Sequence, residues 1–183
     1  MTTPIKLYRH PKSGHCHRVE LMLALLGLPY ETIDLDMANG AHKAPDFLRI
    51  SPFGLVPAID DEGYVLADSN AILVYLAGTY ASAPNWLPRE PRAAAEVQRW
   101  LSVAADNIYA GPCAARLVKV FGVDLDHAAA VKKAHALFKV MEAHLHGRDW
   151  LATDTVSIAD VAGYSYIAHR SEEHTSELQS RQV

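Results

Sequence analysis

The side chains best suited to chemistry stand at the start of the first expected helix. Ser13 comes just before this helix, which is expected over residues 15–26, and Cys16 falls in its first turn. Free amides and the helix dipole favour negative charge there, so the cysteine is expected to have a lowered pKa and to form mixed disulfides with other thiols. The ordinary role of a serine before a helix is an N-cap, which accepts a hydrogen bond from a helix amide. Both roles stay open at this stage.

Three histidines near the same helix start raise the question of a metal site. His10, His15 and His17 are close in sequence, but adjacent polar residues in one turn point in different directions and no carboxylate completes a ligand set. Cys16 and Cys113 are far apart and match neither a disulfide framework nor a zinc site. We therefore expect no metal and two reduced thiols.

Composition narrows the classes of partner. The chain has 183 residues, of which 50% are hydrophobic, enough for a substantial core. Its net charge is -4 and no block of Lys or Arg stands out, which argues against a nucleic-acid partner. No apolar run of about 18 residues and no secretory signal is present. We expect a cytoplasmic protein with no membrane partner, whose partners are small molecules or another subunit.

Residues 1–82 are expected to form an α/β domain, because runs with a period of two alternate with helical periodicity. The elements expected are a strand at 5–8, a helix at 15–26, a strand at 30–35, a helical turn at 46–50, a hairpin of 56–59 and 64–66 around a turn at 60–63, and a helix at 69–80. Their order is β-α-β followed by β-β-α.

Residues 90–169 are expected to form a second, all-α domain after a proline-containing linker at 81–91. A long helix at 92–122 should be kinked at Gly111-Pro112, because proline lacks the backbone donor. A second helix is expected at 124–146. A third should begin near Ser157 and Asp160, whose spacing is a variant of the capping box, and should run to about residue 169.

The end of the chain has a different character. Residues 170–180 resemble the translation of a sequencing-library adapter, which predicts that residues 170–183 are a non-native tail and that the helical domain is incomplete. A natural polar tail is the alternative. A shortened domain should be less stable and should associate through exposed apolar surface.

Three motifs, in order and at these spacings, resemble the glutathione S-transferase family, and the resemblance extends over residues 4 to about 169. They are Ser13–Val19 (SGHCHRV), Ser51–Ala58 (SPFGLVPA) and Leu66–Ile72 (LADSNAI). The first resembles the serine-type, theta- or zeta-like bacterial members. The resemblance implies a thioredoxin-like α/β N-terminal domain, an all-α C-terminal domain, and glutathione as co-substrate.

The resemblance also implies roles for individual residues. Ser13 would donate a hydrogen bond to the thiolate of glutathione, with Cys16 as the alternative catalytic residue. Val56-Pro57 resembles the family's cis-proline turn, which presents the Val56 backbone to the cysteinyl part; an ordinary trans proline is the alternative. Asp68 and Ser69 would hold the γ-glutamyl part, although Asp-Ser is also an ordinary cap pair.

Further contacts follow from the same resemblance. His42 and Lys43 would contact the glycyl carboxylate, or else belong to a solvated loop. Leu55 stands where many relatives have Gln or Lys; it cannot donate a hydrogen bond, which predicts weaker glutathione binding. The electrophile pocket, expected between the domains, is assigned four residues that packing or surface positions would explain equally well: Tyr109, Pro112, Cys113 and Arg116.

The expected function is that of an enzyme that conjugates glutathione to a small hydrophobic electrophile, or reduces the electrophile with it. The alternatives are a non-catalytic interaction module of the same fold and an inactive fragment. The apolar content of the helix carrying Ile72, Leu73 and Leu76 and of the long helix, together with the resemblance, predicts a homodimer.

Overall fold

The computed structural model describes residues 3–82 and 86–168, and the chain divides into two compact units, residues 1–87 and 88–183. The expected non-native tail at 170–183 lies outside the described residues. Each unit is treated by itself below.

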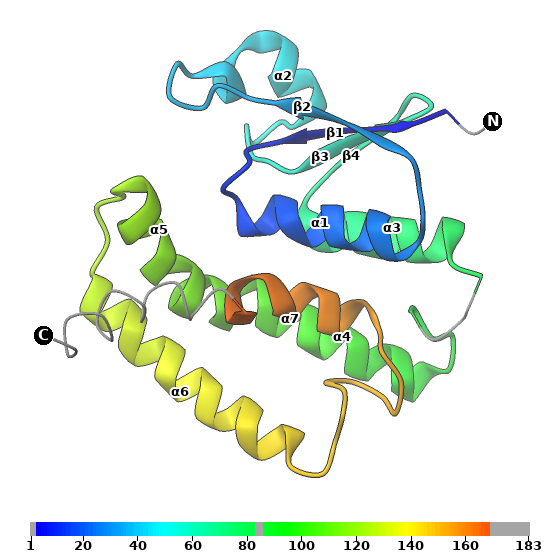
Figure 1. Cartoon of the computed structure of the whole chain (residues 1–183), viewed down its shortest axis with the longest axis vertical. Helices are drawn as coiled ribbons and strands as arrows, with labels where there is room; N and C mark the ends of the chain where they lie inside the picture. Colours follow the sequence, from blue (N-terminus) through cyan, green and yellow to red (C-terminus); the bar gives the residue numbers. More distant parts are fainter. Residues whose placement is uncertain (1–2, 83–85, 169–183) are drawn as a thin grey trace, which may run out of the picture. The chain divides into compact units, whose positions relative to one another are not determined.

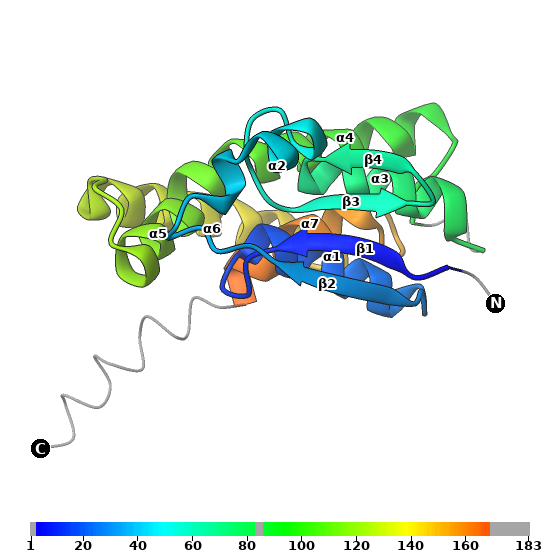
Figure 2. The same cartoon turned by 90° about the horizontal axis from the view of Figure 1, so that it is seen from above.

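The first unit is built on a four-stranded sheet in the order β2-β1-β3-β4 (Figure 2). Strand β1 (Ile5–Arg9) pairs in parallel with β2 (Tyr30–Asp34) and antiparallel with β3 (Ala58–Asp61), which forms a hairpin with β4 (Tyr64–Ala67). The thioredoxin-like α/β fold predicted from the sequence is confirmed.

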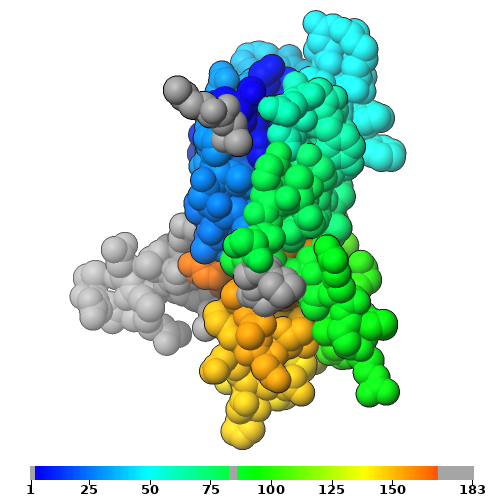
Figure 3. Space-filling view, turned by 90° about the vertical axis from the view of Figure 1, so that its right-hand side faces the viewer, coloured from blue at the N-terminus to red at the C-terminus, as the bar shows by residue number. Residues whose placement is uncertain are grey.

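Two helices cover one face of this sheet, and both were predicted. Helices α1 (Gly14–Leu25) and α3 (Ser69–Tyr80) lie side by side there, although they are far apart in the sequence (Figures 1 and 3). Figure 1 shows the short helix α2 (Pro45–Ile50) on the other side of the sheet, where the Phe47 ring lies 6.0 Å from that of Tyr8. A 3-10 turn, Ala41–Lys43, precedes α2.

The core of the first unit lies between the sheet and these two helices. Its apolar side chains are 0 to 3% exposed: Ile5, Leu7, Val19, Met22, Leu23, Ile59, Ile72, Leu73 and Leu76. Burying one such side chain stabilises the fold by about 1.5 to 3 kcal/mol. The core therefore contains Ile72, Leu73 and Leu76, which are fully buried. The inference that their apolar content marks a dimer surface was wrong.

The β3–β4 hairpin turns more tightly than predicted. Asp60 and Asp61 belong to β3, and only Glu62 and Gly63 form the turn, with φ of 51° and 92°. A two-residue turn with positive φ at both positions matches the twist of the strands. Asp61 is therefore inside the fold, where its Oδ2 accepts hydrogen bonds from the hydroxyls of Tyr75 at 2.7 Å and Tyr80 at 2.5 Å.

The helical unit begins with α4 (Pro91–Ala105), which the Glu90 side chain caps. The helix predicted over 92–122 is divided: α4 ends at Ala105, a π-helical turn follows at Tyr109–Cys113, and α5 spans Ala114–Phe121. The π-helical turn contains Gly111 and Pro112, where the kink was predicted. Pro112 has no N–H to continue the ladder, which favours the wider turn there. Gly111 lets this turn approach α6 closely, since a Cβ would lie 2.9 Å from the Ala134 nitrogen.

The last two helices are close to their predicted positions. Helix α6 (His127–Leu145) is capped by Asp126, and α7 (Ile158–Ala168) packs against α4. The predicted cap of α7 is confirmed: the Ser157 amide donates to Asp160 Oδ2 at 2.9 Å, and the Ala159 amide donates to Ser157 Oγ at 3.3 Å. Among residues 3–82 and 86–168, no helix has the length and apolar character needed to span a bilayer.

Candidate functional site

The site is built around the N-terminus of α1. Ser13 is the N-cap residue, with extended backbone (φ -82°, ψ 121°), and its Oγ accepts the Cys16 amide at 3.3 Å. The side chain is half-buried. In this cap, a lone pair of the Ser13 hydroxyl oxygen accepts the hydrogen bond. The hydroxyl therefore keeps its own proton and can still donate it.

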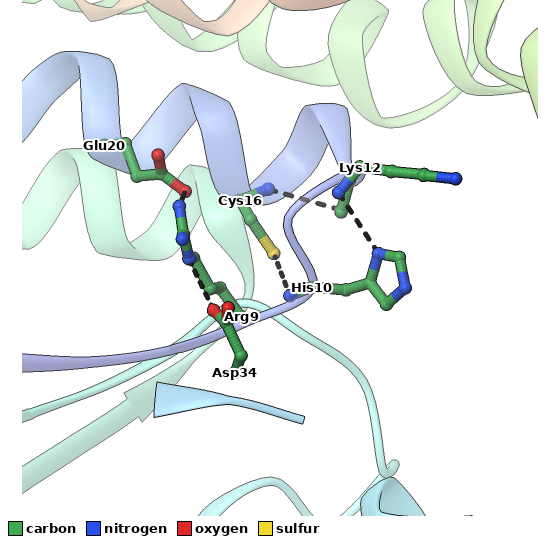
Figure 4. A network of polar contacts seen from close by, with 7 residues as sticks. Arg9, His10, Lys12, Cys16, Glu20 and Asp34 are labelled. Carbon is green, nitrogen blue, oxygen red and sulfur yellow. Dashed lines mark hydrogen bonds and ion pairs between the residues drawn. The ribbon is translucent and has the colours of Figure 1, made fainter. Parts of the chain in front are cut away.

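The loop that carries Ser13 is held at several points (Figure 4). The His10 amide donates to Cys16 Sγ at 3.5 Å, and the Lys12 amide donates to His10 Nδ1 at 3.2 Å. Just before the loop, Arg9 contacts Glu20 of α1 at 3.0 Å and Asp34 of β2 at 2.7 Å. These contacts fix the end of β1 relative to α1, and so fix where Ser13 lies.

Cys16 does not have the lowered pKa expected from its place in the helix. Its side chain is fully buried, and this burial raises the pKa of the thiol to about 11, although hydrogen bonds with Ser13 and the His10 amide act in the opposite direction. Desolvation disfavours the thiolate more than the helix start favours it. At neutral pH the Cys16 thiol is therefore protonated, and it serves as an acceptor for the His10 amide.

The second segment of the site is the turn before β3. The Val56-Pro57 peptide bond is cis, with Pro57 buried and Val56 half-buried. Ser51 supports the turn, because its Oγ accepts the Leu55 amide at 3.2 Å and donates to the Leu55 carbonyl at 2.8 Å. The Leu55 side chain itself is 62% exposed.

The His42-Lys43 segment packs directly on this turn. Lys43 Nζ donates to the Phe53 carbonyl at 3.1 Å. Gly54, with φ of 62°, lies so close that a Cβ there would be 2.6 Å from the His42 carbonyl oxygen. His42 and Lys43 thus contact the turn before β3, while Lys43 is also exposed to solvent.

The third segment is the start of α3. Asp68 caps this helix with a positive φ of 82°, and its Oδ1 accepts the amides of Asn70 and Ala71, both at 2.9 Å. The carboxylate of Asp68 is exposed. Ser69 is 5% exposed, and its Oγ accepts a hydrogen bond from Arg18 Nη1 at 2.9 Å.

Arg18 is a residue of this site that sequence reasoning missed. It is 1% exposed, and Nη1 also donates to Asn70 Oδ1 at 2.7 Å. One signal was available: Gly14, Arg18 and Met22 are spaced four apart and share the buried face of α1. Burial, together with the positive charge of Arg18, lowers the pKa of the neighbouring His15 to about 4, against the opposing effect of Asp68. His15 is therefore neutral at physiological pH.

Strand register brings the three segments to one end of the sheet. Tyr8, near the end of β1, pairs with Ala58, which directly follows Pro57. Ala58 also pairs with Ala67, the residue before Asp68. Ser13, the Val56-Pro57 turn and the start of α3 therefore converge, and the positive ends of two helix dipoles lie there. A small molecule with an anionic group and a thiol suits such a place.

The four electrophile candidates, all in the second unit, have unequal exposure. Tyr109 is 51% exposed and Arg116 is half-buried, but Pro112 and Cys113 are buried in the π-helical turn. The last two do not reach open surface in this unit, and the assignment of all four to an electrophile pocket stays a prediction. A groove of about 450 Å³ in this unit has a different lining: Trp100, Val103, Asp106, Asn107, Ala110, Lys133, Ala136, Leu137 and Val140.

Metal ligation has no candidate in the described part of the chain. There, no three His, Cys, Asp or Glu side chains gather closely enough to hold a metal ion. His10, His15 and His17 of the α1 start thus form no ligand cluster.

The fold and the converging segments define a class: a thioredoxin-like domain with a cis-proline turn facing a helix N-terminus, followed by a helical unit. Residues 3–78 match the family model for the glutathione S-transferase N-terminal domain, and residues 124–174 match that for the C-terminal domain. The chain belongs to the glutathione S-transferase family.

Individual relatives agree with this. Glutathione S-transferase 3 of Zea mays is 38% identical over 164 residues, which cover 86% of this chain and 74% of that protein. Glutathione S-transferase GstB of Escherichia coli (strain K12) is 32% identical, covering 86% of this chain and 79% of that protein. The crystal structure of glutathione S-transferase from Pseudomonas fluorescens superposes with a TM-score of 0.84 at 31% identity, covering 93% of this chain and 86% of that one. The protein is a glutathione transferase that uses glutathione as co-substrate, and the non-catalytic alternative is not favoured.

Proposed function

We propose that Ser13 is the catalytic residue of this glutathione transferase, and that its hydroxyl stabilises the thiolate of glutathione for attack on a small hydrophobic electrophile. A free thiol with a pKa of roughly 8.5 is only a few per cent ionised at neutral pH. A hydroxyl donor and a helix N-terminus both favour the anion, and each pKa unit gained corresponds to ~1.36 kcal/mol.

The observation that carries this proposal is the position of the Ser13 hydroxyl. It is half-buried at the α1 N-terminus, and it caps the helix by accepting a hydrogen bond from the Cys16 amide. Its own proton can therefore be donated to a sulfur anion. The same hydroxyl is within hydrogen-bonding reach of the Cys16 thiol. Because that thiol is neutral and the glutathione sulfur is charged, the bound thiolate is the stronger acceptor.

Glutathione would lie along the three converging segments. The Val56 backbone, beside Pro57, would hold the cysteinyl part. Asp68 would face the γ-glutamyl ammonium group with its exposed carboxylate, and Ser69 would hold the γ-glutamyl carboxylate. These two assignments match opposite partners. The exposed carboxylate of Asp68 can accept from the ammonium group, and the Ser69 hydroxyl can donate to the carboxylate.

The glycyl end would be held less firmly. His42 and Lys43 are assigned to the glycyl carboxylate, but Lys43 Nζ already donates to the Phe53 carbonyl at 3.1 Å, so it has fewer donors to offer. Leu55 is exposed and contributes only apolar contact. Affinity for glutathione should therefore come mainly from the cysteinyl and γ-glutamyl parts.

The decisive experiment compares Ser13→Ala with Cys16→Ala. We expect Ser13→Ala to raise the pKa of bound glutathione by about one unit or more and to lower kcat, with a much smaller change in the Kd of glutathione. Thiolate absorbance against pH, steady-state kinetics and calorimetry measure the three quantities. Cys16→Ala should leave the pKa of bound glutathione and kcat almost unchanged.

Loss of the cap must be separated from loss of the donor, because Ser13→Ala removes both and capping contributes about 1 kcal/mol to stability. Ser13→Thr keeps a hydroxyl and serves as the matched control, which should recover most of the activity. Normal turnover in Ser13→Ala, with turnover abolished in Cys16→Ala, would transfer the role to Cys16.

Five finer statements are proposals as well. Tyr109, Pro112, Cys113 and Arg116 are assigned to the electrophile pocket, and of these Tyr109 is exposed and Arg116 is half-buried. Assignment to the serine-type, theta- or zeta-like subclass rests on Ser13, and reductase activity is a secondary possibility of the same thiolate chemistry. Cytoplasmic location is supported by two cysteines that are both free thiols. A homodimer is proposed, with support from apolar side chains exposed in both units, such as Val74 and Val140.

A further inference from the structure

Two ion pairs meet at Arg9, the last residue of β1, just before the loop that carries Ser13. Arg9 Nη1 lies 3.0 Å from Glu20 Oε1 on α1, and Arg9 Nε donates to Asp34 Oδ1 on β2 at 2.7 Å (Figure 4). The hydrogen bond with Glu20, followed by that with Asp34, raises the pKa of the Arg9 guanidinium, which is therefore charged at any physiological pH. A single side chain thus joins β1 and β2 to α1.

The end of β1 meets α1 at two successive turns. Cys16 and Glu20 are four residues apart and share one face of the helix. The His10 amide donates to Cys16 Sγ at 3.5 Å, and the Arg9 side chain contacts Glu20 one turn further on. Apolar packing of α1 on the sheet is non-directional, whereas a guanidinium fork fixes both distance and angle. A shift of α1 along its axis would therefore break the Arg9–Glu20 contact.

The loop between Arg9 and Ser13 has little freedom of its own. The Ser13 amide donates to the His10 carbonyl at 2.9 Å, and the Lys12 amide donates to His10 Nδ1 at 3.2 Å. On the side of the sheet, the Arg9 carbonyl accepts the Leu35 amide at 2.9 Å. The position of the Ser13 hydroxyl therefore follows from how the end of β1 is set against α1.

We propose that Arg9 is a positioning residue for the transferase reaction, which acts through Glu20 to keep the Ser13 hydroxyl within hydrogen-bonding reach of the bound sulfur. The inference rests on the proposed role of Ser13. The Arg9 and Glu20 side chains are 22% and 20% exposed, and ion pairs that solvent reaches contribute little to stability. A displacement of about 1 Å near reacting atoms can nevertheless lower a rate roughly a hundredfold. Loss of this contact should therefore affect catalysis more than stability.

The first test is Arg9→Met in the full chain, because methionine is also long and unbranched but carries no charge. We expect kcat at saturating glutathione to fall about tenfold and the pKa of bound glutathione to rise. The Kd of glutathione should stay within about twofold, and Tm should fall by less than about 4 °C. Steady-state kinetics, thiolate absorbance against pH, calorimetry and a thermal melt measure these quantities. An unchanged kcat with an unchanged pKa of bound glutathione would overturn the proposal.

A double-mutant cycle tests whether Arg9 acts through Ser13. In a Ser13→Ala background the hydroxyl is absent, so Arg9→Met should cause little further loss of kcat. An equal fold-loss from Arg9→Met in both backgrounds would assign Arg9 a general structural role and would overturn the inference.

Matched variants separate this contact from the loss of any ion pair. Lys6→Met removes another ion pair of β1, with Asp60 at 3.8 Å, and should leave kcat and the pKa of bound glutathione unchanged. Glu20→Met should reproduce the loss seen in Arg9→Met, and it replaces Arg9→Met in the cycle if that variant does not fold. Arg9→Lys should recover part of kcat, because lysine keeps the charge but not the fork. A normal kcat in Glu20→Met, or an equal loss in Lys6→Met, would overturn the proposal.

The two levels of proposal fail differently. Normal turnover in Ser13→Ala would remove Ser13 from the reaction, and the inference about Arg9 would fall with it. A loss of turnover in Ser13→Ala, together with normal turnover in Arg9→Met, would overturn the inference alone and leave the proposed function standing.

Discussion

At the residue scale, the start of α1 holds a hydroxyl and a thiol that differ in burial and therefore in their ability to act at neutral pH. Ser13 is half-buried and keeps a proton to donate, whereas Cys16 is fully buried and its pKa is raised to about 11. Position in a first helical turn predicts a reactive cysteine, and burial reverses that prediction because a thiolate needs solvent or compensating charge. Burial thus favours the Ser13 hydroxyl over the Cys16 thiol, in line with the proposed function.

Thiol reactivity tests this contrast directly. Both cysteines of the chain are buried, Cys113 at 1% exposed, so we expect neither to react rapidly with a disulfide reagent at neutral pH. In denaturant both should react. The measurement is the time course of thiol release with and without denaturant, and one fast thiol that disappears in Cys16→Ala would contradict the burial of Cys16.

At the element scale, two glycines allow backbone segments to approach each other closely. Gly54 brings the turn before β3 against the His42-Lys43 segment, and Gly111 brings the π-helical turn against α6. In each case a side chain would meet backbone atoms, which cannot rotate away. At these positions, glycine is required because a neighbouring backbone segment leaves no room for a Cβ, and not only because of the residue's own dihedral angles.

Gly54→Ala tests this requirement. Its φ of 62° should cost about 1 to 2 kcal/mol for any side chain, and the 2.6 Å approach to the His42 carbonyl should add to that. Gly27→Ala is the matched control, with φ of 66° and nothing within 4 Å. We expect chemical denaturation to show a clearly larger loss for Gly54→Ala, together with weaker glutathione binding. Equal losses would mean that the segments separate without cost.

At the scale of the whole molecule, two units of different architecture each bury their own core. The first unit packs a sheet against α1 and α3, and the second packs α4 against α7 and the π-helical turn against α6. The apolar residues of α3 that resembled a dimer surface belong to the first of these cores. Association must therefore use other side chains, such as Val74 on α3 or Val140 on α6, which are 37% and 64% exposed.

Dimerisation is predicted for the full chain. We expect sedimentation equilibrium to give twice the chain mass of 20.1 kDa at micromolar concentration. Burial of apolar surface between copies supplies the driving force, so the dimer should persist at high salt. A single species of chain mass across the concentration range would count against the dimer.

Much of this protein could be predicted from local patterns. The strands, α1, α3 and the cap of α7 follow from periodicity and from turn and cap residues, which act over a few positions along the chain. The convergence of Ser13, Val56-Pro57 and Asp68-Ser69 was predicted only through a family resemblance. No local rule joins segments that are tens of residues apart.

Tertiary structure alone decided the rest. It buried Cys16 and so raised the pKa of its thiol, and it placed Ile72, Leu73 and Leu76 in a core. It also joined Arg18 of α1 to Ser69 and Asn70 of α3, whereas spacing within α1 indicates only that Arg18 is on the buried face. Local sequence specifies which elements form, whereas burial and partners depend on neighbours that only the folded chain brings close.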